Sequence, residues 1–384
     1  MSHPKIQRFA ATLGAIALAL AAGGCGTDGE TATAPAEQAV VDPAEHTPAD
    51  PDAAETAAPA ELGGTVTLIT HNSFHVDEEL LWAFEDETGL TVEHLAIGNA
   101  AVLTNQVALT AGSPLGDVVF GIDSNFAGRV LDAGALEPFL PGNLPTGVER
   151  YLLFAGDDEP ILTPIARGDV CINYDLDWFA AAGIAPPATF ADLTNPEFRD
   201  LLVVMNPVTS SPGLAFLLAT IAEFGEDGGW RQFWADLREG GVRVAESWSL
   251  AYNSEFTATS PEGTHPIIVS YASSPAFTLN ADETATTTAA LTDTCFQQIE
   301  YAGLLRGAAN PDGGRALLEW LLTPDFQAGI PGSMWIWPID PAIAPPADWA
   351  AHAARPAASL TLPPELVEAN RDAWLDQWTE TVLD

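Results

Sequence analysis

The run TVTLIT (Thr65–Thr70), read with the segments that follow it, decides the fold of this chain. Its length and β-branched content are typical of a buried strand. The segment Asp77–Thr88 then places its apolar residues on one face of a helix, and Gly89 stands where helices commonly end in a left-handed residue. The first elements are therefore predicted to be a strand followed by a helix.

The same alternation continues along the chain. Thr91–Leu95 is predicted to be a strand, Ala101–Ala111 a helix, and Asp117–Phe120 a short buried strand. This order predicts a parallel sheet with right-handed crossovers, and ligands bind beyond the carboxyl ends of such strands. Three segments fall at those ends, namely His71–Phe74, Gly98–Ala100 and Gly121–Asn125.

A second α/β unit is predicted from about Arg167 to Asp293, and no internal repeat is evident. The chain then returns through Cys295–Tyr301 to two more helices. The expected strands of this unit are Leu201–Val204, Val242–Ala245 and Ile267–Ser270. The two later helices are expected at Asp312–Leu322 and Pro364–Val382. In the last helix Trp374, Trp378 and Val382 recur every four residues, which predicts a packed face. The expected fold is α/β with two lobes.

The N-terminus has the features of an export signal. Lys5 and Arg8 precede an apolar run that is short for a membrane-spanning helix, and the small residues Ala22–Gly24 lead into Cys25. We therefore expect residues 1–25 to be a lipoprotein signal ending at the lipobox, with Cys25 lipidated. Plain secretion is the alternative. A lipid on Cys25 would hold the protein on the outer face of the cell membrane.

Composition divides the rest of the chain. Residues 26–62 contain Ala, Thr, Pro, Asp and Glu without an aromatic residue, Lys or Arg, which predicts a disordered acidic linker. The formal net charge of the whole chain is −40, so nucleic acid and acidic lipid surfaces are poor partners. About 320 residues remain after the linker, enough for two lobes with separate cores.

Cys171 and Cys295 are the remaining cysteines, and each lies in a strand-like run. An exported chain meets an oxidising environment, which favours a disulfide between them over two separate buried thiols. No CxxC motif occurs, so the pair is expected to be structural.

Two sets of residues suggest ligand binding. Ser210 and Ser211 precede a Pro-Gly helix start, where unpaired backbone N–H groups suit an anion such as phosphate, although simple N-capping explains them equally. Trp248, Tyr271 and Trp335 offer flat faces that suit a planar cation, although single aromatic residues more often only pack. Asp123 is either a charge partner for the cation or a helix cap.

Several runs resemble the thiamine-binding members of the type II periplasmic binding proteins, which are the substrate-binding components of ABC importers. The resemblance covers about residues 63–384, and the runs that carry it are THNSF (Thr70–Phe74), DVVFGIDSN (Asp117–Asn125), Asn206-Pro207 through Pro212-Gly213, SWS (Ser247–Ser249), VSYASSPA (Val269–Ala276), and Ile330-Pro331 through WIWP (Trp335–Pro338).

This resemblance implies two lobes, 63–166 with 297–384 and 167–296, joined by crossover strands and closing on thiamine or its phosphates. The expected protein is a monomer that delivers its ligand to a membrane permease driven by an ATPase. It needs no cofactor, and only the lipid anchor touches the membrane.

The resemblance also implies roles for individual residues. Trp248, Tyr271 and Trp335 are expected to face the pyrimidine and thiazolium rings, and Ser210 and Ser211 to meet the hydroxyethyl or phosphate end. The amine end departs from the family, because His71 replaces a Tyr and Asn99 replaces an Asp. The other expected ligand-binding residues are Asn72, Ser73 and Asp123.

Other functions remain as alternatives. Ferric-ion carriers share the fold, but their adjacent tyrosine pair is missing here, and His71 and His75 lack a third zinc ligand at motif spacing. A polyamine in the same cleft is the nearer alternative. An enzyme is not expected, because the chain has no GxSxG, GxxxxGK[ST] or HExxH motif.

Overall fold

The computed structural model of the protein describes residues 62–156 and 159–384. These residues fall within one compact unit of the chain. The expected signal peptide, Cys25 and all of the expected linker except Leu62 lie outside the described residues.

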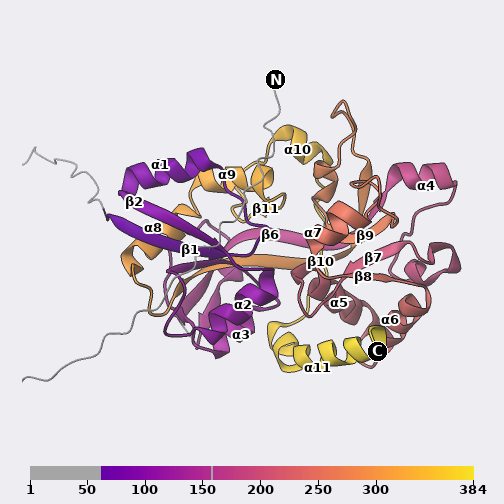
Figure 1. The fold of residues 1–384 in the computed structure, drawn as a ribbon, viewed down its shortest axis with the longest axis horizontal. Coiled ribbons are helices and arrows are strands. Elements are labelled where there is room, and N and C mark those ends of the chain that lie inside the picture. The colour runs from indigo at the N-terminus through magenta and orange to yellow at the C-terminus, as the bar shows by residue number, and fades with distance from the viewer. Residues whose placement is uncertain (1–61, 157–158) are drawn as a thin grey trace, which may run out of the picture. The chain divides into compact units, whose positions relative to one another are not determined.

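The described strands form a mixed sheet in which two parallel groups flank a pair of long antiparallel strands (Figure 1). The order along the sheet is β2-β1-β3-β10-β6-β9-β7-β8. Their bounds are β1 Gly64–Thr70, β2 Leu90–Ala96, β3 Val118–Asp123, β6 Glu159–Asp175, β7 Leu202–Met205, β8 Arg243–Ala245, β9 Ile267–Tyr271 and β10 Thr288–Leu305. Short strands β4 (Leu136–Glu137), β5 (Leu153–Ala155) and β11 (Trp337–Pro338) pair at the sides of β10 and β6.

The parallel pairing confirms the predicted topology in both groups. β1 pairs in parallel with β2 and β3, and β7 pairs in parallel with β8 and β9. β6 and β10 are antiparallel to each other and are the long central strands of the sheet, lying between the two parallel groups. The expected α/β fold class, with crossover strands between two α/β halves, is confirmed.

Helices cover both groups of strands. Their bounds are α1 Glu78–Thr88, α2 Ala100–Leu109, α3 Ala127–Asp132, α4 Leu176–Ala182, α5 Ser211–Phe224, α6 Gly229–Glu239, α7 Trp248–Leu250, α8 Pro311–Trp320, α9 Pro324–Ser333, α10 Ala347–His352 and α11 Pro364–Val382. The two ends of α1 are set by capping residues. Asp77 caps the start by accepting from the Glu79 N–H, and Gly89 ends the helix with φ of 69°. A π-helical turn, Ala251–Glu255, follows α7 directly.

The buried apolar residues form two main clusters, one for each parallel group. The first cluster surrounds β1 and β3 and includes α8, and the second surrounds β7 and β9 and includes α5 and α6. Each group of strands thus has its own hydrophobic core, which supports the proposed division into two lobes.

Helix α11 packs on the second core. Its side chain Trp378 is fully buried and meets Trp234 of α6 edge to face, with ring centroids 5.5 Å apart. Its Arg371 also donates to the carbonyl of Asn125, in the loop after β3, at 3.4 Å. The packed face predicted for this helix is therefore present. The lobe boundaries remain a proposal, and this packing favours assigning α11 to the second lobe.

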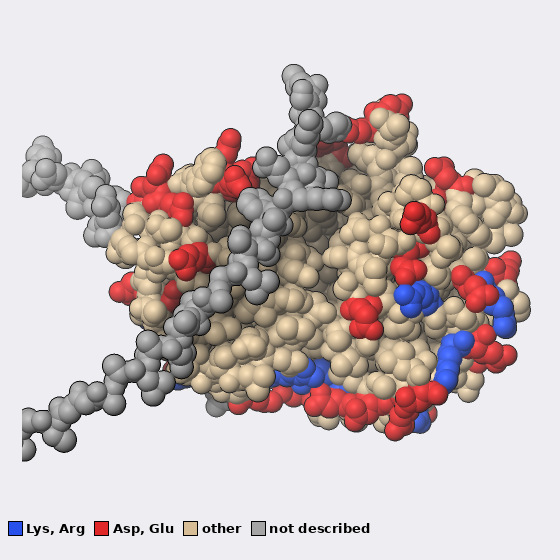
Figure 2. Space-filling model, viewed as in Figure 1, with Lys and Arg blue, Asp and Glu red and all other residues tan. Residues whose placement is uncertain are grey.

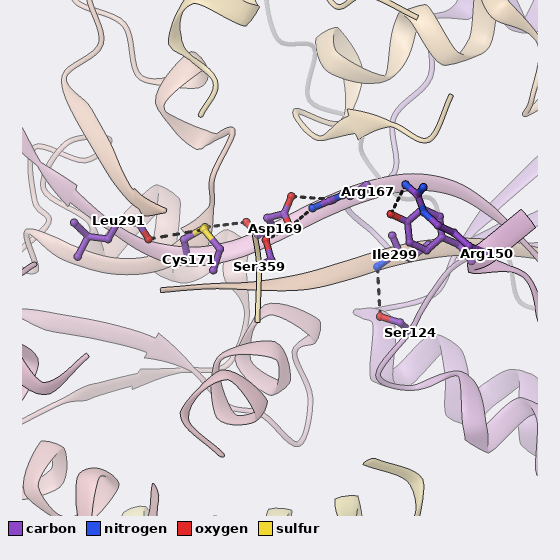
Figure 3. Close-up of polar contacts among 10 residues, drawn as sticks. Ser124, Arg150, Arg167, Asp169, Cys171, Leu291, Ile299 and Ser359 are labelled. Carbon is purple, nitrogen blue, oxygen red and sulfur yellow. Dashed lines mark hydrogen bonds and ion pairs between the residues drawn. A yellow bond between two sulfur atoms is a disulfide. The ribbon is translucent and has the colours of Figure 1, made fainter. Parts of the chain in front are cut away.

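The crossover strands are fastened to each other and to the C-terminal part of the chain. A disulfide joins Cys171 on β6 to Cys295 on β10. On β6, Arg167 donates two hydrogen bonds to Asp169, which also accepts from the Ser359 hydroxyl at 2.6 Å (Figure 3). Because Asp169 is almost fully buried, this network satisfies a carboxylate that would otherwise be costly inside the fold.

Candidate binding site

A cavity of about 300 Å³ lies where the two halves meet. This volume is at the lower end of the range for small-molecule sites. The cavity is lined from the first half by the segments after β1 and β2 and by the end of α9. From the second half it is lined by the start of α5, by α7 and its π-helical turn, and by the end of β9. Both halves would therefore touch a molecule bound in it.

The cavity brings together all the predicted ligand-binding residues except Asp123. Those in its lining are His71, Asn72, Ser73, Asn99, Ser210, Ser211, Trp248, Tyr271 and Trp335. They come from six separate stretches of the chain, and the strand-end positions meet as the parallel topology predicts.

Trp248 is fixed in orientation by its neighbours. Its ring stacks on Tyr252 with centroids 4.7 Å apart and planes 22° apart, and its Nε1–H donates to the Ser270 hydroxyl at 2.9 Å. The Ser270 and Ser274 hydroxyl oxygens are in turn 2.7 Å apart. A ring held on one face and at its polar edge leaves its other face available.

Trp335 stands in the cavity wall with an unusual backbone conformation. Its φ is 59°, in the left-handed region that bulky residues rarely adopt. The Ser273 hydroxyl donates to its carbonyl oxygen at 2.6 Å, and its ring meets Phe277 edge to face at 4.4 Å. Strain of this kind is kept where a side chain must point in one direction, which at this position is toward the cavity.

Tyr271 lies between the aromatic and acidic parts of the cavity. Burial raises the pKa of its hydroxyl, and the nearby carboxylates of Glu300 and Asp123 raise that pKa further. The phenol therefore stays neutral at physiological pH and presents a ring and a hydroxyl, not a phenolate.

The start of α5 is built as a helix N-terminus that is open to the cavity. Ser210 caps the helix by accepting from the Gly213 N–H at 3.4 Å. A Cβ at Gly213 would lie 2.7 Å from the Met205 carbonyl oxygen, so only glycine allows the helix to start this close to β7. Ser210 is thus an N-cap and also lines the cavity, and the two readings of this residue are compatible.

Asp123 sits beneath this helix start and is not among the cavity-lining residues. Its carboxylate accepts from the backbone N–H groups of Asn125 at 2.7 Å and Phe126 at 3.2 Å, and from the Ser211 hydroxyl. Burial raises its pKa to about 6, with a further contribution from Glu300, although these hydrogen bonds act in the opposite direction. Asp123 therefore caps the loop after β3 and ties the first half to α5.

The polar end of the cavity contains His71, Asn99 and a carboxylate that sequence reasoning missed, Glu300. The His71 Nδ1 accepts from the Ser73 N–H at 3.2 Å, so the neutral ring carries its proton on Nε2, which lies 3.6 Å from Glu300 Oε2. Asn99 caps α2 by accepting from the Val102 N–H at 3.3 Å. Its amide nitrogen is not used in that cap.

Glu300, Tyr252 and Phe277 line the cavity without having been predicted. One signal for Glu300 was available, since it is an acidic residue inside the strand-like stretch that follows Cys295. The two aromatic residues give no such signal. The carboxylate of Asp77, which lies before α1, caps that helix and is not part of the cavity lining.

The described residues contain neither a cluster of metal ligands nor a membrane-spanning helix. Within residues 62–156 and 159–384, no three His, Cys, Asp or Glu side chains gather as a metal site would require. In the same residues no helix combines the length and apolar character needed to cross a bilayer.

Acidic side chains dominate the charged surface. Figure 2 shows Asp and Glu over α1 and along the edge at α11, with few Lys and Arg among them, while uncharged residues occupy most of the centre of this face. The surface distribution agrees with the net charge of −40. Such a field attracts cations and repels anionic ligands and polymers.

Two parallel half-sheets, two long crossover strands and a cavity between two cores define a type II periplasmic binding protein fold. In agreement, the family of bacterial extracellular solute-binding proteins matches residues 113–282. The chain resembles thiamine-binding periplasmic proteins over most of its length. It is 29% identical to the one from Brucella suis over 330 residues, which cover 84% of this chain and 93% of the relative. It is 26% identical to the one from Salmonella typhimurium over 331 residues, covering 85% and 96%.

A solved structure is also similar to this chain. A periplasmic thiamin binding protein superposes with a TM-score of 0.71 and 24% identity, covering 83% of this chain and 96% of that chain. The fold predicted from the sequence is therefore the fold observed, and the family resemblance is confirmed.

Proposed function

We propose that this protein is the substrate-binding component of an ABC importer and captures thiamine or a thiamine phosphate in the cavity between its halves. The observation that carries the proposal is the cavity itself. Three aromatic side chains, a helix N-terminus and a buried carboxylate meet in a space of about 300 Å³. The thiamine-binding proteins to which the chain is similar support the same ligand.

Each part of thiamine has a chemical counterpart in the cavity. Its thiazolium ring is a planar cation, which aromatic faces stabilise by roughly 0.5–2 kcal/mol each when water is excluded. Trp248, Tyr271 and Trp335 supply such faces. The hydroxyethyl or phosphate end matches the start of α5, where Ser210 and Ser211 line the cavity at the positive end of the helix dipole. The aminopyrimidine end matches His71, Asn72, Ser73 and Asn99.

Capture would follow from closure of the two halves on the ligand. Closure is favoured only by contacts that a ligand makes to both halves at once, and the lining meets that condition. β6 and β10 are the connections across which the halves would bend. The hydrogen bond from Ser211 to Asp123 joins the halves at the base of the cavity in the structure described here.

The remaining features of the proposal concern the cell. The protein would be lipidated at Cys25, held on the outer face of the membrane by residues 26–62, and would act as a monomer that docks on a permease driven by an ATPase. It would carry thiamine without altering it. The aromatic cavity also distinguishes this ligand from a polyamine, whose flexible chain of charges calls for several carboxylates along the site.

The proposal is tested by identifying what the protein holds. Protein purified from cells grown with thiamine is denatured, and the small molecules released are analysed by mass spectrometry. We expect a thiamine species in near-equal amount to protein. A Trp248→Ala protein prepared in parallel should release much less, and Trp82→Ala, which changes an exposed tryptophan outside the cavity, should release as much as the wild type. Release of a polyamine or of ferric ion in place of thiamine would contradict the proposal.

A further inference from the structure

Glu300 is a buried carboxylate at the base of the cavity. It lies on β10 opposite Asp123 of β3, is 7% exposed and forms part of the cavity lining. Its Oε1 is 3.5 Å from the Gln298 amide nitrogen, but its Oε2 is buried without a hydrogen-bond partner among the described residues. Buried polar atoms are nearly always paired, so an unpaired carboxylate oxygen on a residue that lines a cavity requires an explanation.

Among the described residues that line the cavity, none beside Glu300 carries a permanent positive charge. The cavity lining contains no Lys or Arg, and the nearest group that can carry positive charge is the His71 ring. Its Nε2 stands 3.6 Å from Oε2, which is longer than a hydrogen bond and pairs the two charges only when the ring is protonated. From the neighbouring elements, Asp123 adds negative charge and Tyr271 presents a neutral phenol. The carboxylate is therefore available to a positive charge that enters the cavity.

We infer that Glu300 is the residue that recognises the positive charge of the ligand, through direct attraction between its carboxylate and the ligand's cationic ring. This inference rests on the proposed function, which supplies the thiazolium ring as that cation. A thiazolium is charged at every physiological pH, so the attraction needs no proton transfer. At the low effective dielectric of a closed cavity it is much stronger than in water. Glu300 thus selects for charge, whereas the aromatic rings select for shape.

The test compares thiamine with deazathiamine, a neutral isostere in which carbon replaces the thiazolium nitrogen. Dissociation constants are measured for both compounds with the wild type, with Glu300→Gln and with Glu246→Gln. Glu246 is exposed beside Ser247, so Glu246→Gln removes the same formal charge near the cavity without altering its base. Thermal unfolding without ligand confirms that each variant is folded.

We expect Glu300→Gln to weaken thiamine binding about 30-fold or more and to change deazathiamine binding little, as removal of one member of a buried charge pair does. Glu246→Gln should leave both dissociation constants within about twofold, since exposed charges are screened. The wild-type preference for thiamine over deazathiamine should therefore fall at least about tenfold in Glu300→Gln only.

The possible results separate the two proposals. Equal binding of thiamine and deazathiamine by the wild type would overturn the inference that Glu300 recognises the charge of the ligand. This result is obtained from the wild type alone, without any variant. A wild-type preference that survives in Glu300→Gln also overturns it, and the proposed function stands in both cases. A wild type that binds neither compound overturns the proposed function and this inference with it.

Discussion

Replacing the buried Asp123 by Asn should remove the contribution of this residue to the pH dependence of stability. Burial raises the pKa of Asp123 from 3.8 to about 6, so the folded protein holds this proton more tightly than the unfolded chain does. The contribution of Asp123 to the free energy of unfolding therefore falls as the pH rises from about 4 to about 6, and it is lost above that range. A rise of this size corresponds to about 3 kcal/mol, because each pKa unit is worth about 1.4 kcal/mol.

Asn keeps the shape of the side chain and can still accept from the backbone N–H groups of Asn125 and Phe126, but it carries no charge. The advantage of Asp123→Asn over the wild type should therefore grow by about 1–3 kcal/mol between about pH 4 and about pH 7. The growth is the informative quantity, since any constant effect of Asn on packing cancels.

Urea denaturation of the ligand-free protein at both pH values measures this growth. Asp86→Asn, the same chemical change at an exposed side chain of α1, serves as the control and should show none. A difference between Asp123→Asn and the wild type that is the same at both pH values would refute the reasoning. It would show that the hydrogen bonds to the carboxylate outweigh its burial.

Three further predictions concern binding and packing. Trp248→Ala should weaken thiamine binding by roughly 1–3 kcal/mol in a titration, and unchanged affinity would remove this ring from the site. Replacing Cys171 and Cys295 together by Ala should lower the free energy of unfolding by about 2–5 kcal/mol, because the disulfide joins residues 124 positions apart in sequence; an unchanged denaturation midpoint would contradict this. Trp378→Ala should cost about 3–5 kcal/mol of stability, since the ring is fully buried against Trp234, and a cost below about 1 kcal/mol would show that α11 contributes little to the second core.

Much of the fold could be predicted because its signals are local. The strand at Thr65–Thr70 and the helix start at Asp77 depend on residue types within one or two turns of the chain, and the structure confirms both. The parallel topology follows from the order of these elements. It brings the segment at His71 and the segment at Asn99 to one edge of the sheet, which is why both reach the cavity.

The parts that sequence could not supply depend on contacts between distant segments. Glu300 lines the cavity because β10 is a central strand that pairs with β3, in a register that no local pattern records. The sequence placed Asp123 just after a short buried strand, and in the structure it is the last residue of β3. Its hydrogen bond from Ser211 could not be predicted, because it depends on how α5 packs against the first half. The packing of α11 on α6 was likewise hidden, because a row of tryptophans shows that a face is buried without showing the surface that it meets.

The most direct test of the account is calorimetric titration of the purified, ligand-free protein with thiamine and, separately, with spermidine. We expect thiamine to bind at one site per chain with a dissociation constant in the micromolar range or tighter, and spermidine to give no saturable heat. Saturable binding of spermidine without a response to thiamine would contradict the central claim that the cavity is built for a planar aromatic cation.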